Sequence, residues 1–354
     1  MEHEYSLNSL YLYLTDRCNL CCDHCWISPT FSRERQPGIP LEPLKRAICE
    51  AMPLGLGSVK LTGGEPLLYR YIDQLLSFLA AQELSVIVET NGTLINGEVI
   101  SLFKSCDMGQ ISVSLDAATQ EIHDEIRGVK GSFQRTLKGM RLLSENDLDF
   151  QVIMALQQRN SLEIPGVVRL SRDLGAGSLK INPLIPCGRG RRIFKEHRNL
   201  ELDELIRLFR MVKEEESRPD DPEIIFDLPP VFRPVQDLMR TNVSECNILN
   251  ILGILGSGDF SICGIGQTMK ELRMGNLSDT GITDVWKNSL ILKDLRMSLP
   301  WKLKGICGRC IFRFRCLGAC RANAYTLSRD FYAPYFLCQE YFDSGKFPGS
   351  RYMD

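Results

Sequence analysis

Hydrophobic and polar residues follow two recurring patterns along the first two thirds of the chain. Short β-rich runs alternate with longer stretches whose apolar residues recur at helical spacing. Strands that alternate with helices in this way indicate parallel βα units. The predicted strands are residues 11–15, 58–62, 85–90, 111–116, 150–156 and 179–185. The predicted helices are residues 41–52, 71–82, 97–106, 132–146, 164–175 and 201–217.

This alternation predicts an α/β fold with a partial (β/α)6 TIM-like barrel over residues 1–217, because six units fall short of the eight in a closed barrel. Residues 218–245 are rich in proline and predict a linker. Residues 246–354 are rich in cysteine and predict a small separate domain. The loops with polar, glycine-rich or cysteine-rich motifs follow strands at their carboxyl ends, where parallel βα folds build their sites.

Charge and hydropathy exclude several classes of protein. The net charge of -2 gives no sign of a polyanionic partner such as nucleic acid. No apolar run approaches the length of a membrane span, and the acidic N-terminus lacks the pattern of a signal peptide. We therefore expect a cytoplasmic protein. Its 14 cysteines then suggest metal binding or catalysis, because cytosolic thiols are kept reduced.

The first cysteine cluster is the stretch CNLCCDHCW, residues 18–26, directly after the first predicted strand. Its spacing fits two adjoining CxxC pairs, Cys18 with Cys21 and Cys22 with Cys25. It also fits one CxxxCxxC motif in which Cys21 takes no part. A zinc site normally separates its two pairs by a loop, which is missing here.

Read as CxxxCxxC, the segment resembles the hallmark motif of the radical S-adenosylmethionine (SAM) superfamily. In that family the motif follows the first strand of a partial barrel. The resemblance implies that Cys18, Cys22 and Cys25 hold a [4Fe–4S] cluster with one open iron. A second hallmark follows the next strand as Gly63, Gly64, Glu65 and Pro66. In the family this segment holds the amino group of SAM, and a carboxylate suits an ammonium.

Weaker matches complete the SAM site that the resemblance implies. The segment SVSLDA resembles the family's ribose-contacting strand end, which makes Ser114 and Asp116 candidates. The segment IHDEIRG makes Arg127 a candidate partner of the SAM carboxylate. Asn91 is a further candidate, although its Asn-Gly pair also suits a plain turn.

The C-terminal cysteines resemble the SPASM domain, which carries auxiliary iron–sulfur clusters in many radical SAM enzymes. The resemblance implies two further [4Fe–4S] clusters, so three in all with SAM as co-substrate. The ligands of the distal cluster would be Cys307, Cys310, Cys316 and Cys338. Those of the nearer cluster would be Cys246, Cys263 and Cys320. A zinc ribbon is the competing interpretation.

The nearer cluster thus has three predicted cysteine ligands. An open iron that binds substrate is the simple expectation. The alternative is a ligand from elsewhere in the chain, with Cys187 as one candidate. A plain loop thiol is the interpretation we favour for Cys187 from sequence alone. Asp259 is a candidate catalytic base near this cluster.

The resemblance implies an enzyme that reductively cleaves SAM to a 5′-deoxyadenosyl radical and abstracts a hydrogen atom from its substrate. SPASM-type enzymes mostly act on peptides, so we expect crosslinking, thioether formation or epimerisation in a ribosomally made peptide. Expected partners are a flavodoxin or ferredoxin reductant and a separate leader-recognition protein. Alternatives are tetrapyrrole chemistry, such as decarboxylation of a haem precursor, formylglycine maturation of a sulfatase, or a zinc-bound binding module.

Overall fold

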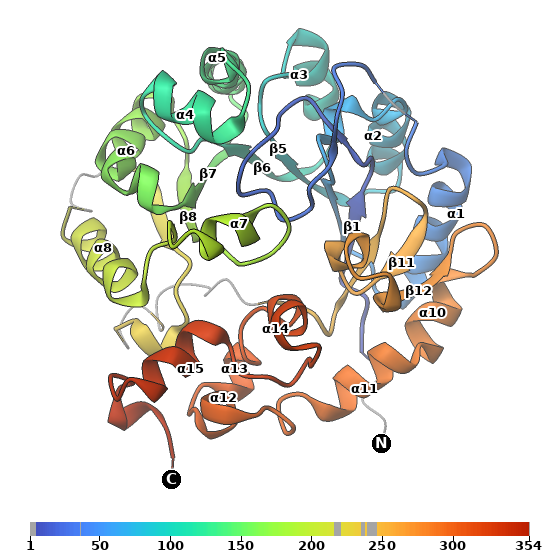
Figure 1. Cartoon of the computed structure of the whole chain (residues 1–354). Coiled ribbons are helices and arrows are strands. Elements are labelled where there is room, and N and C mark those ends of the chain that lie inside the picture. Colours follow the sequence, from blue (N-terminus) through green and yellow to red (C-terminus); the bar gives the residue numbers. More distant parts are fainter. Residues whose placement is uncertain (1–4, 36, 216–220, 235–237, 239–245, 354) are drawn as a thin grey trace.

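The computed structural model describes residues 5–35, 37–215, 221–234, 238 and 246–353. It shows an α/β fold built on one curved sheet, with helices around the outside of the strands (Figure 1). The predicted fold class is confirmed. In the described residues the sheet has ten strands in the order β12-β11-β10-β1-β4-β5-β6-β7-β8-β9.

The six predicted strands form the continuous parallel centre of this sheet, each paired with its neighbour in chain order. Each lies within three residues of its predicted position. Their bounds are β1 (Ser9–Tyr13), β4 (Ser58–Thr62), β5 (Ser85–Thr90), β6 (Met108–Ser114), β7 (Gln151–Leu156) and β8 (Ser178–Pro183).

The sheet extends across both predicted domain boundaries. Strand β9 (Glu223–Phe226) lies inside the predicted linker and pairs in parallel with β8. Strand β10 (Ile251–Ile254) lies in the cysteine-rich part and pairs in parallel with β1. Strands β11 (Asp259–Ser261) and β12 (Arg273–Asn276) add an antiparallel edge. Much of the predicted linker, residues 218–220, 235–237 and 239–245, is outside the described residues.

The helices around the sheet are amphipathic and bury one apolar stripe. In α1 the buried residues Leu41, Leu44, Ile48 and Ala51 recur at helical spacing and face the sheet. Strand β1 correspondingly directs the fully buried Leu10 and Leu12 into the main core. The helices of this half are α1 (Leu41–Ala51), α2 (Ile72–Ala81), α3 (Gly97–Lys104), α4 (Gln120–Arg127), α5 (Ser132–Ser144), α6 (Ile164–Asp173), α7 (Gly190–Lys195) and α8 (Leu202–Glu215).

The C-terminal third is mostly helical. Helices α1–α8 leave one side of the curved sheet uncovered, and the C-terminal third lies along that side (Figure 1). Its helices are α10 (Ile282–Asn288), α11 (Leu290–Ser298), α12 (Gly305–Arg309), α13 (Arg313–Cys316), α14 (Arg321–Ser328) and α15 (Phe336–Asp343). No helix in the described part of the chain combines the length and apolar character that a membrane span needs.

Two-residue strands and short 3-10 helices complete the described part of the chain. The strands β2 (Arg17–Cys18) and β3 (Thr30–Phe31) pair with each other in the loop after β1. The 3-10 helices are η1 (Met52–Leu54), η2 (Pro66–Leu68), η3 (Gln158–Glu163), η4 (Pro230–Phe232), η5 (Gly264–Gln267), η6 (Lys270–Leu272) and η7 (Gly349–Arg351).

Candidate active site and metal centres

The first cysteine cluster lies in the loop that leaves the carboxyl end of β1. Cys18 and Cys22 are buried and Cys25 is half-buried, and the three pack in one small cluster with Leu20. Cys21 is exposed. Its backbone N–H donates to the Arg127 carbonyl at 2.9 Å, which ties the loop to the end of α4. The loop therefore turns three thiols inward and the fourth outward.

The glycine pair after β4 lies directly against the backbone of this cysteine loop. Gly64 donates its N–H to Thr15 at 2.8 Å, and Glu65 donates to the Arg17 carbonyl at 2.8 Å. A Cβ on Gly64 would stand 1.9 Å from the Arg17 carbonyl oxygen. Gly63 has φ +127°, a conformation that favours glycine. The two glycines thus permit a backbone approach that no larger residue allows.

Glu65 is almost fully buried, and its carboxylate accepts three hydrogen bonds. The donors are Thr90 Oγ1 at 2.6 Å, the Asn91 N–H at 2.9 Å and the Leu67 N–H at 3.2 Å. Burial raises the pKa of Glu65 to about 7, although these hydrogen bonds oppose the shift. A nearby ammonium group would relieve the cost of burying this charge.

Asn91 connects the same carboxylate to the cysteine loop. Its side-chain amide nitrogen lies 3.9 Å from Cys18 Sγ and donates to Asn19 Oδ1 at 2.8 Å. The structure therefore brings Cys18, Glu65 and Asn91 together at the carboxyl ends of β1, β4 and β5. Ser114, half-buried, ends the next strand, β6.

Asp116 and Arg127 form a buried ion pair beside the cysteine loop. Arg127 Nε lies 2.8 Å from Asp116 Oδ2, and Arg127 Nη1 contacts Cys22 Sγ at 3.7 Å. Arg127 and other charges lower the pKa of Asp116 despite its complete burial. Burial raises the pKa of the Cys22 thiol to about 11, while the Arg127 charge opposes this shift. The guanidinium thus compensates negative charge on both groups.

His24 and His123 also belong to this buried network, and sequence reasoning gave them no role. His24 Nδ1 lies 3.9 Å from Asp116 Oδ2. His123 Nδ1 accepts from the Asp116 N–H at 3.3 Å, and burial lowers its pKa to about 4. Isolated histidines far apart in sequence carry no local signal of such a contact.

Four of the C-terminal cysteines line one pocket. Its other walls include the apolar residues Ile306, Phe312 and Phe347. Burial raises the pKa of Cys316 to about 12, and the nearby Cys307 and Cys310 raise it further. The four cysteines are the set predicted for the distal cluster, Cys307, Cys310, Cys316 and Cys338.

Of the remaining three cysteines, Cys246 precedes β10, Cys263 follows β11 and Cys320 is the N-cap residue of α14. Burial raises the pKa of Cys246 to about 12, and Cys320 raises it further. Cys263 has a raised pKa for the same reasons, burial first and then Cys320 and Cys246. Cys246, Cys263 and Cys320 therefore lie near one another, and their assignment to one cluster stays a prediction.

Arg321 is buried between these two thiol sets. Its Nη1 donates to the carbonyls of Phe331 at 2.9 Å and Ala333 at 2.7 Å. Its Nε and Nη2 have no hydrogen-bond partner among the described residues. Burial lowers its pKa, and thiols of both sets, Cys307, Cys316, Cys320 and Cys246, oppose that shift. Two unpaired donors beside thiols of both sets suit sulfur-rich, negatively charged groups.

The geometry fits iron–sulfur clusters better than single metal ions. In the described residues no three Cys, His, Asp or Glu side chains converge closely enough for one ion. A four-iron cubane spaces its ligand sulfurs more widely than an ion does. An apolar pocket walled by four thiols, unpaired arginine donors and an inward-facing group of three thiols are features such clusters require.

Asp259 is engaged in structural contacts. Its carboxylate accepts from Arg273 Nη1 at 2.7 Å, Asn276 Nδ2 at 2.9 Å and Ser257 Oγ at 2.6 Å. The hydrogen bonds and the Arg273 charge outweigh burial and lower its pKa. A carboxylate with a lowered pKa is a poor general base, so we do not carry this candidate forward.

Comparison with known families agrees with this geometry. Residues 12–170 match the Radical SAM superfamily. Residues 246–311 match the SPASM iron–sulfur cluster-binding domain. The first match covers the loop after β1, the glycine pair and Arg127, and the second covers four of the seven C-terminal cysteines.

Two curated relatives align with most of the chain. An AdoMet-dependent heme synthase of Methanosarcina barkeri is 28% identical, over 90% of this chain and 92% of its own. The mycofactocin maturase MftC of Mycobacterium tuberculosis is also 28% identical, over 88% of this chain and 78% of its own. Equal identity to both leaves the substrate open.

A solved structure shares the fold. Streptococcus suis SuiB, bound to the precursor peptide SuiA, superposes with a TM-score of 0.75 at 19% identity, covering 95% of this chain and 76% of SuiB. The matched domains, the fold and the grouped thiols agree with one another. The chain is a radical SAM enzyme with a C-terminal SPASM domain.

Proposed function

We propose that the enzyme oxidatively modifies a peptide, by crosslinking, thioether formation or epimerisation. The observation that carries the proposal is a basic, exposed surface fastened to the first cysteine loop. Arg191, Arg192 and Lys195 of α7 are exposed. The residue before α7, Arg189, donates its N–H to the Cys25 carbonyl at 3.0 Å.

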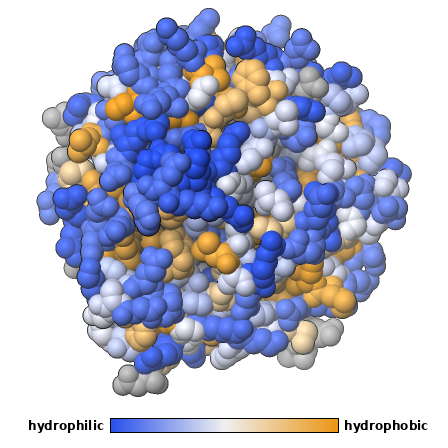
Figure 2. Space-filling view, in the orientation of Figure 1, coloured by the Kyte–Doolittle hydropathy of each residue, from blue (hydrophilic) through white to orange (hydrophobic). Residues whose placement is uncertain are grey.

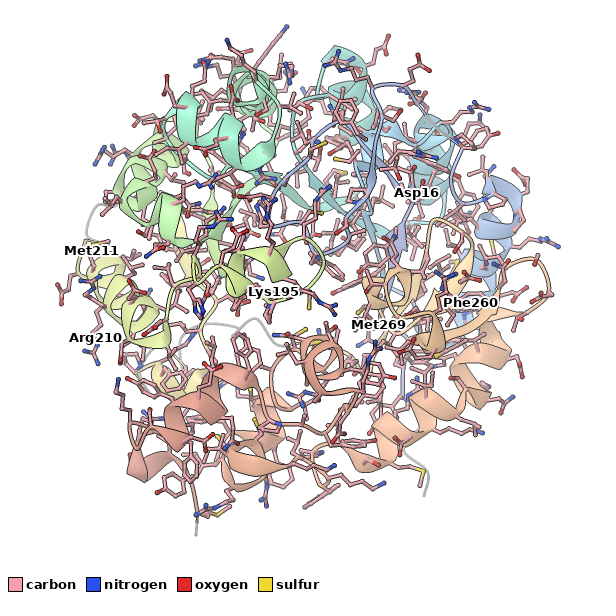
Figure 3. The ribbon with its side chains drawn as sticks, viewed as in Figure 1. Asp16, Lys195, Arg210, Met211, Phe260 and Met269 are labelled. Atoms are coloured by element: carbon pink, nitrogen blue, oxygen red, sulfur yellow. The ribbon has the colours of Figure 1, made fainter. Side chains whose placement is uncertain are left out.

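This surface suits a substrate that extends out of the barrel. Figure 2 shows hydrophilic side chains gathered over the part of the molecule that holds α7 in Figure 1. Figure 3 shows Lys195 near the middle of this face. An acidic peptide would gain from the three positive charges while one of its residues enters the site. SuiB, of the same fold, is seen with a precursor peptide.

The proposed cofactors are SAM and three [4Fe–4S] clusters. Cys18, Cys22 and Cys25 would hold the first, and the two C-terminal thiol sets would hold the others. When bound, these groups supply radical hydrogen-atom abstraction and one-electron redox chemistry. Low-potential electrons would come from a flavodoxin or ferredoxin.

The chain's own residues would bind and orient SAM. Glu65 would accept from the ammonium of SAM, and Ser114 would contact its ribose. Arg127 already pairs with Asp116, so it would reach the SAM carboxylate only with its remaining donors. Arg127 and Asn91 would also stabilise the thiolates of Cys22 and Cys18, because both direct nitrogen atoms at those sulfurs.

A tetrapyrrole is the second candidate substrate, because the heme synthase of M. barkeri aligns over nearly the whole chain. Carboxylates of a haem precursor would also meet the basic surface. A rigid macrocycle, however, cannot extend over α7 as a peptide chain does. The two substrates therefore predict different effects of charge reversal on α7.

The test uses anaerobically reconstituted enzyme with SAM and a chemical reductant. Acidic peptides and a haem precursor are supplied separately, and products are identified by mass spectrometry. We expect peptides that lose two hydrogens or change configuration. The double variant Arg191→Glu with Arg192→Glu should raise KM for the peptide at least tenfold and leave cleavage of SAM without peptide unchanged.

The matched control reverses two exposed arginines of α8, Arg207 and Arg210. Figure 3 shows Arg210 at the edge of the molecule, away from Lys195. It should leave KM for the peptide unchanged. Turnover of the haem precursor with no modified peptide would overturn the proposal in favour of the second candidate.

A further inference from the structure

The loop after β8 carries a buried cysteine that the proposed function leaves unused. Cys187 is 7% exposed. The loop packs tightly on the first cysteine loop, because a Cβ on Gly188 would stand 2.3 Å from the Trp26 carbonyl oxygen. The residues that follow Cys187 therefore hold it in place, because the Arg189 N–H also donates to the Cys25 carbonyl at 3.0 Å.

The Cys187 thiol faces the start of α14, where Cys320 is the N-cap residue. Asn323 lies between the two sulfurs. Its backbone N–H donates to Cys320 Sγ at 3.4 Å, and its side-chain Oδ1 accepts from Cys187 Sγ at 3.8 Å. One residue of α14 thus contacts both a predicted cluster ligand and Cys187.

Asn323 also leaves a buried donor unpaired. The residue is 1% exposed, and its Nδ2 has no hydrogen-bond partner among the described residues. An unpaired buried amide is costly unless an acceptor is present. A cluster at this position would supply sulfur acceptors next to Nδ2. If Cys187 were only a buried thiol that donates to Asn323 Oδ1, the unpaired Nδ2 of Asn323 would have no explanation.

The other two cysteines of the set approach the same place. Cys187 and Cys320 both contribute to the raised pKa of Cys263, after burial as the main cause. Cys320 likewise raises the pKa of Cys187, again after burial. Cys187 therefore lies near Cys320 and Cys263, and both of these lie near Cys246. Four clustered thiols match the ligand number of a complete [4Fe–4S] cluster.

We propose that Cys187 is the fourth ligand of the nearer auxiliary cluster, together with Cys246, Cys263 and Cys320. The thiol releases its proton to solvent when its sulfur binds iron. This cluster then has no open iron, so substrate does not bind to it directly. The inference rests on the auxiliary clusters of the proposed function but not on the identity of the substrate.

The experiment asks whether an added ligand can reach an auxiliary iron. The full-length chain with Cys18, Cys22 and Cys25 changed to Ala retains only the auxiliary sites. It is reconstituted, its iron and sulfide are counted, and it is reduced. ¹³C-cyanide is then added, and electron–nuclear double resonance detects coupling of ¹³C to a reduced cluster. The same measurement follows Cys187→Ala and Cys187→Ser in that background.

We expect about eight irons per chain, because each cubane holds four. We expect no ¹³C coupling while Cys187 is present and clear coupling after Cys187→Ala. The control Cys106→Ala, which removes a partly buried thiol elsewhere in the chain, should show no coupling. Unsubstituted enzyme saturated with SAM should also show none.

Coupling in the chain that keeps Cys187 would overturn the proposal, whether or not the Cys187 variants fold. About four irons, or zinc in place of iron, would show that the auxiliary clusters themselves are wrongly assigned. Failure to find a modified peptide would instead concern the substrate alone.

Discussion

Arg127 Nε lies 2.8 Å from Asp116 Oδ2, and both side chains are buried beside the first cysteine loop. The pair joins the end of α4 to the segment after β6. Because Arg127 also contacts Cys22 Sγ, the same guanidinium sets the position of the loop that carries three predicted ligands. The ion pair therefore links the stability of the barrel to the geometry of the site.

Changing Arg127 to Met should destabilise the protein by about 3–5 kcal/mol, because it leaves the Asp116 carboxylate buried without its partner. Asp116→Asn combined with Arg127→Met should cost less than the sum of the single changes. Chemical denaturation of the four proteins measures both effects. Arg35→Met breaks the exposed pair with Asp73 and should change stability by less than about 1 kcal/mol.

Binding of SAM should depend on pH through Glu65. Its pKa is raised to about 7, so the carboxylate is mostly protonated below that pH in the free enzyme. Only the charged form attracts the SAM ammonium, so affinity is present above pH 7 and lost as the pH falls. We expect Kd to rise about fivefold between pH 7 and pH 6, because half of the carboxylate is already protonated at pH 7.

Calorimetric titration of SAM at several pH values measures this dependence. In Glu65→Gln the affinity should be lower and nearly constant over the same range. A Kd of the unaltered enzyme that does not change between pH 6 and pH 8 would contradict the assigned role of Glu65.

Gly64 should tolerate no side chain, because a Cβ would stand 1.9 Å from the Arg17 carbonyl oxygen. Neither backbone can move without shifting the cysteine loop. Gly64→Ala should cost about 3 kcal/mol and reduce the iron held by the first site. Thermal unfolding and iron analysis test both. Gly97→Ala is the control, since no atom lies within 4 Å of the added Cβ, and it should leave stability unchanged or slightly raised.

Cys21 should be dispensable for the first cluster, because its side chain is exposed while Cys18 and Cys22 are buried. Cys21→Ala should keep all the iron of the unaltered enzyme. Cys22→Ala should lose about four irons per chain. Iron analysis and electron paramagnetic resonance distinguish the two. Equal loss in both variants would mean that the two-pair interpretation of the motif is correct.

The central strands could be predicted from sequence because each is a short β-branched or apolar run between clear turns. Helix α4 could not be predicted from the pattern. Its buried face includes His123 and Arg127, which are polar residues that a hydropathy pattern assigns to the surface. Helix α7 has only six residues, with Gly190 and Ile193 buried, and is too short to show a period. Strand β9 lies in a proline-rich segment, which hid it from the pattern.

The residues of the candidate site likewise fall into those that could be predicted from sequence and those that could not. Cysteines and the glycine pair stand in an ordered pattern, so they carry the family resemblance that implies their chemistry. The pairing of Asp116 with Arg127 could not be predicted, because each was a separate match to a SAM-binding segment. Arg321 and Asn323 gave no signal either. Their importance lies in unpaired buried donors, which only three-dimensional contacts reveal.

The parallel pairing of β1 with β10 has a consequence for synthesis of the chain on the ribosome. Strand β1 emerges first, but its second neighbour begins only at Ile251. One edge of β1 therefore stays without its hydrogen-bonding partner until more than two thirds of the chain has been made. A nascent chain halted before that point presents an open strand edge next to reactive thiols. Complete translation is thus a condition for protecting the first cysteine loop.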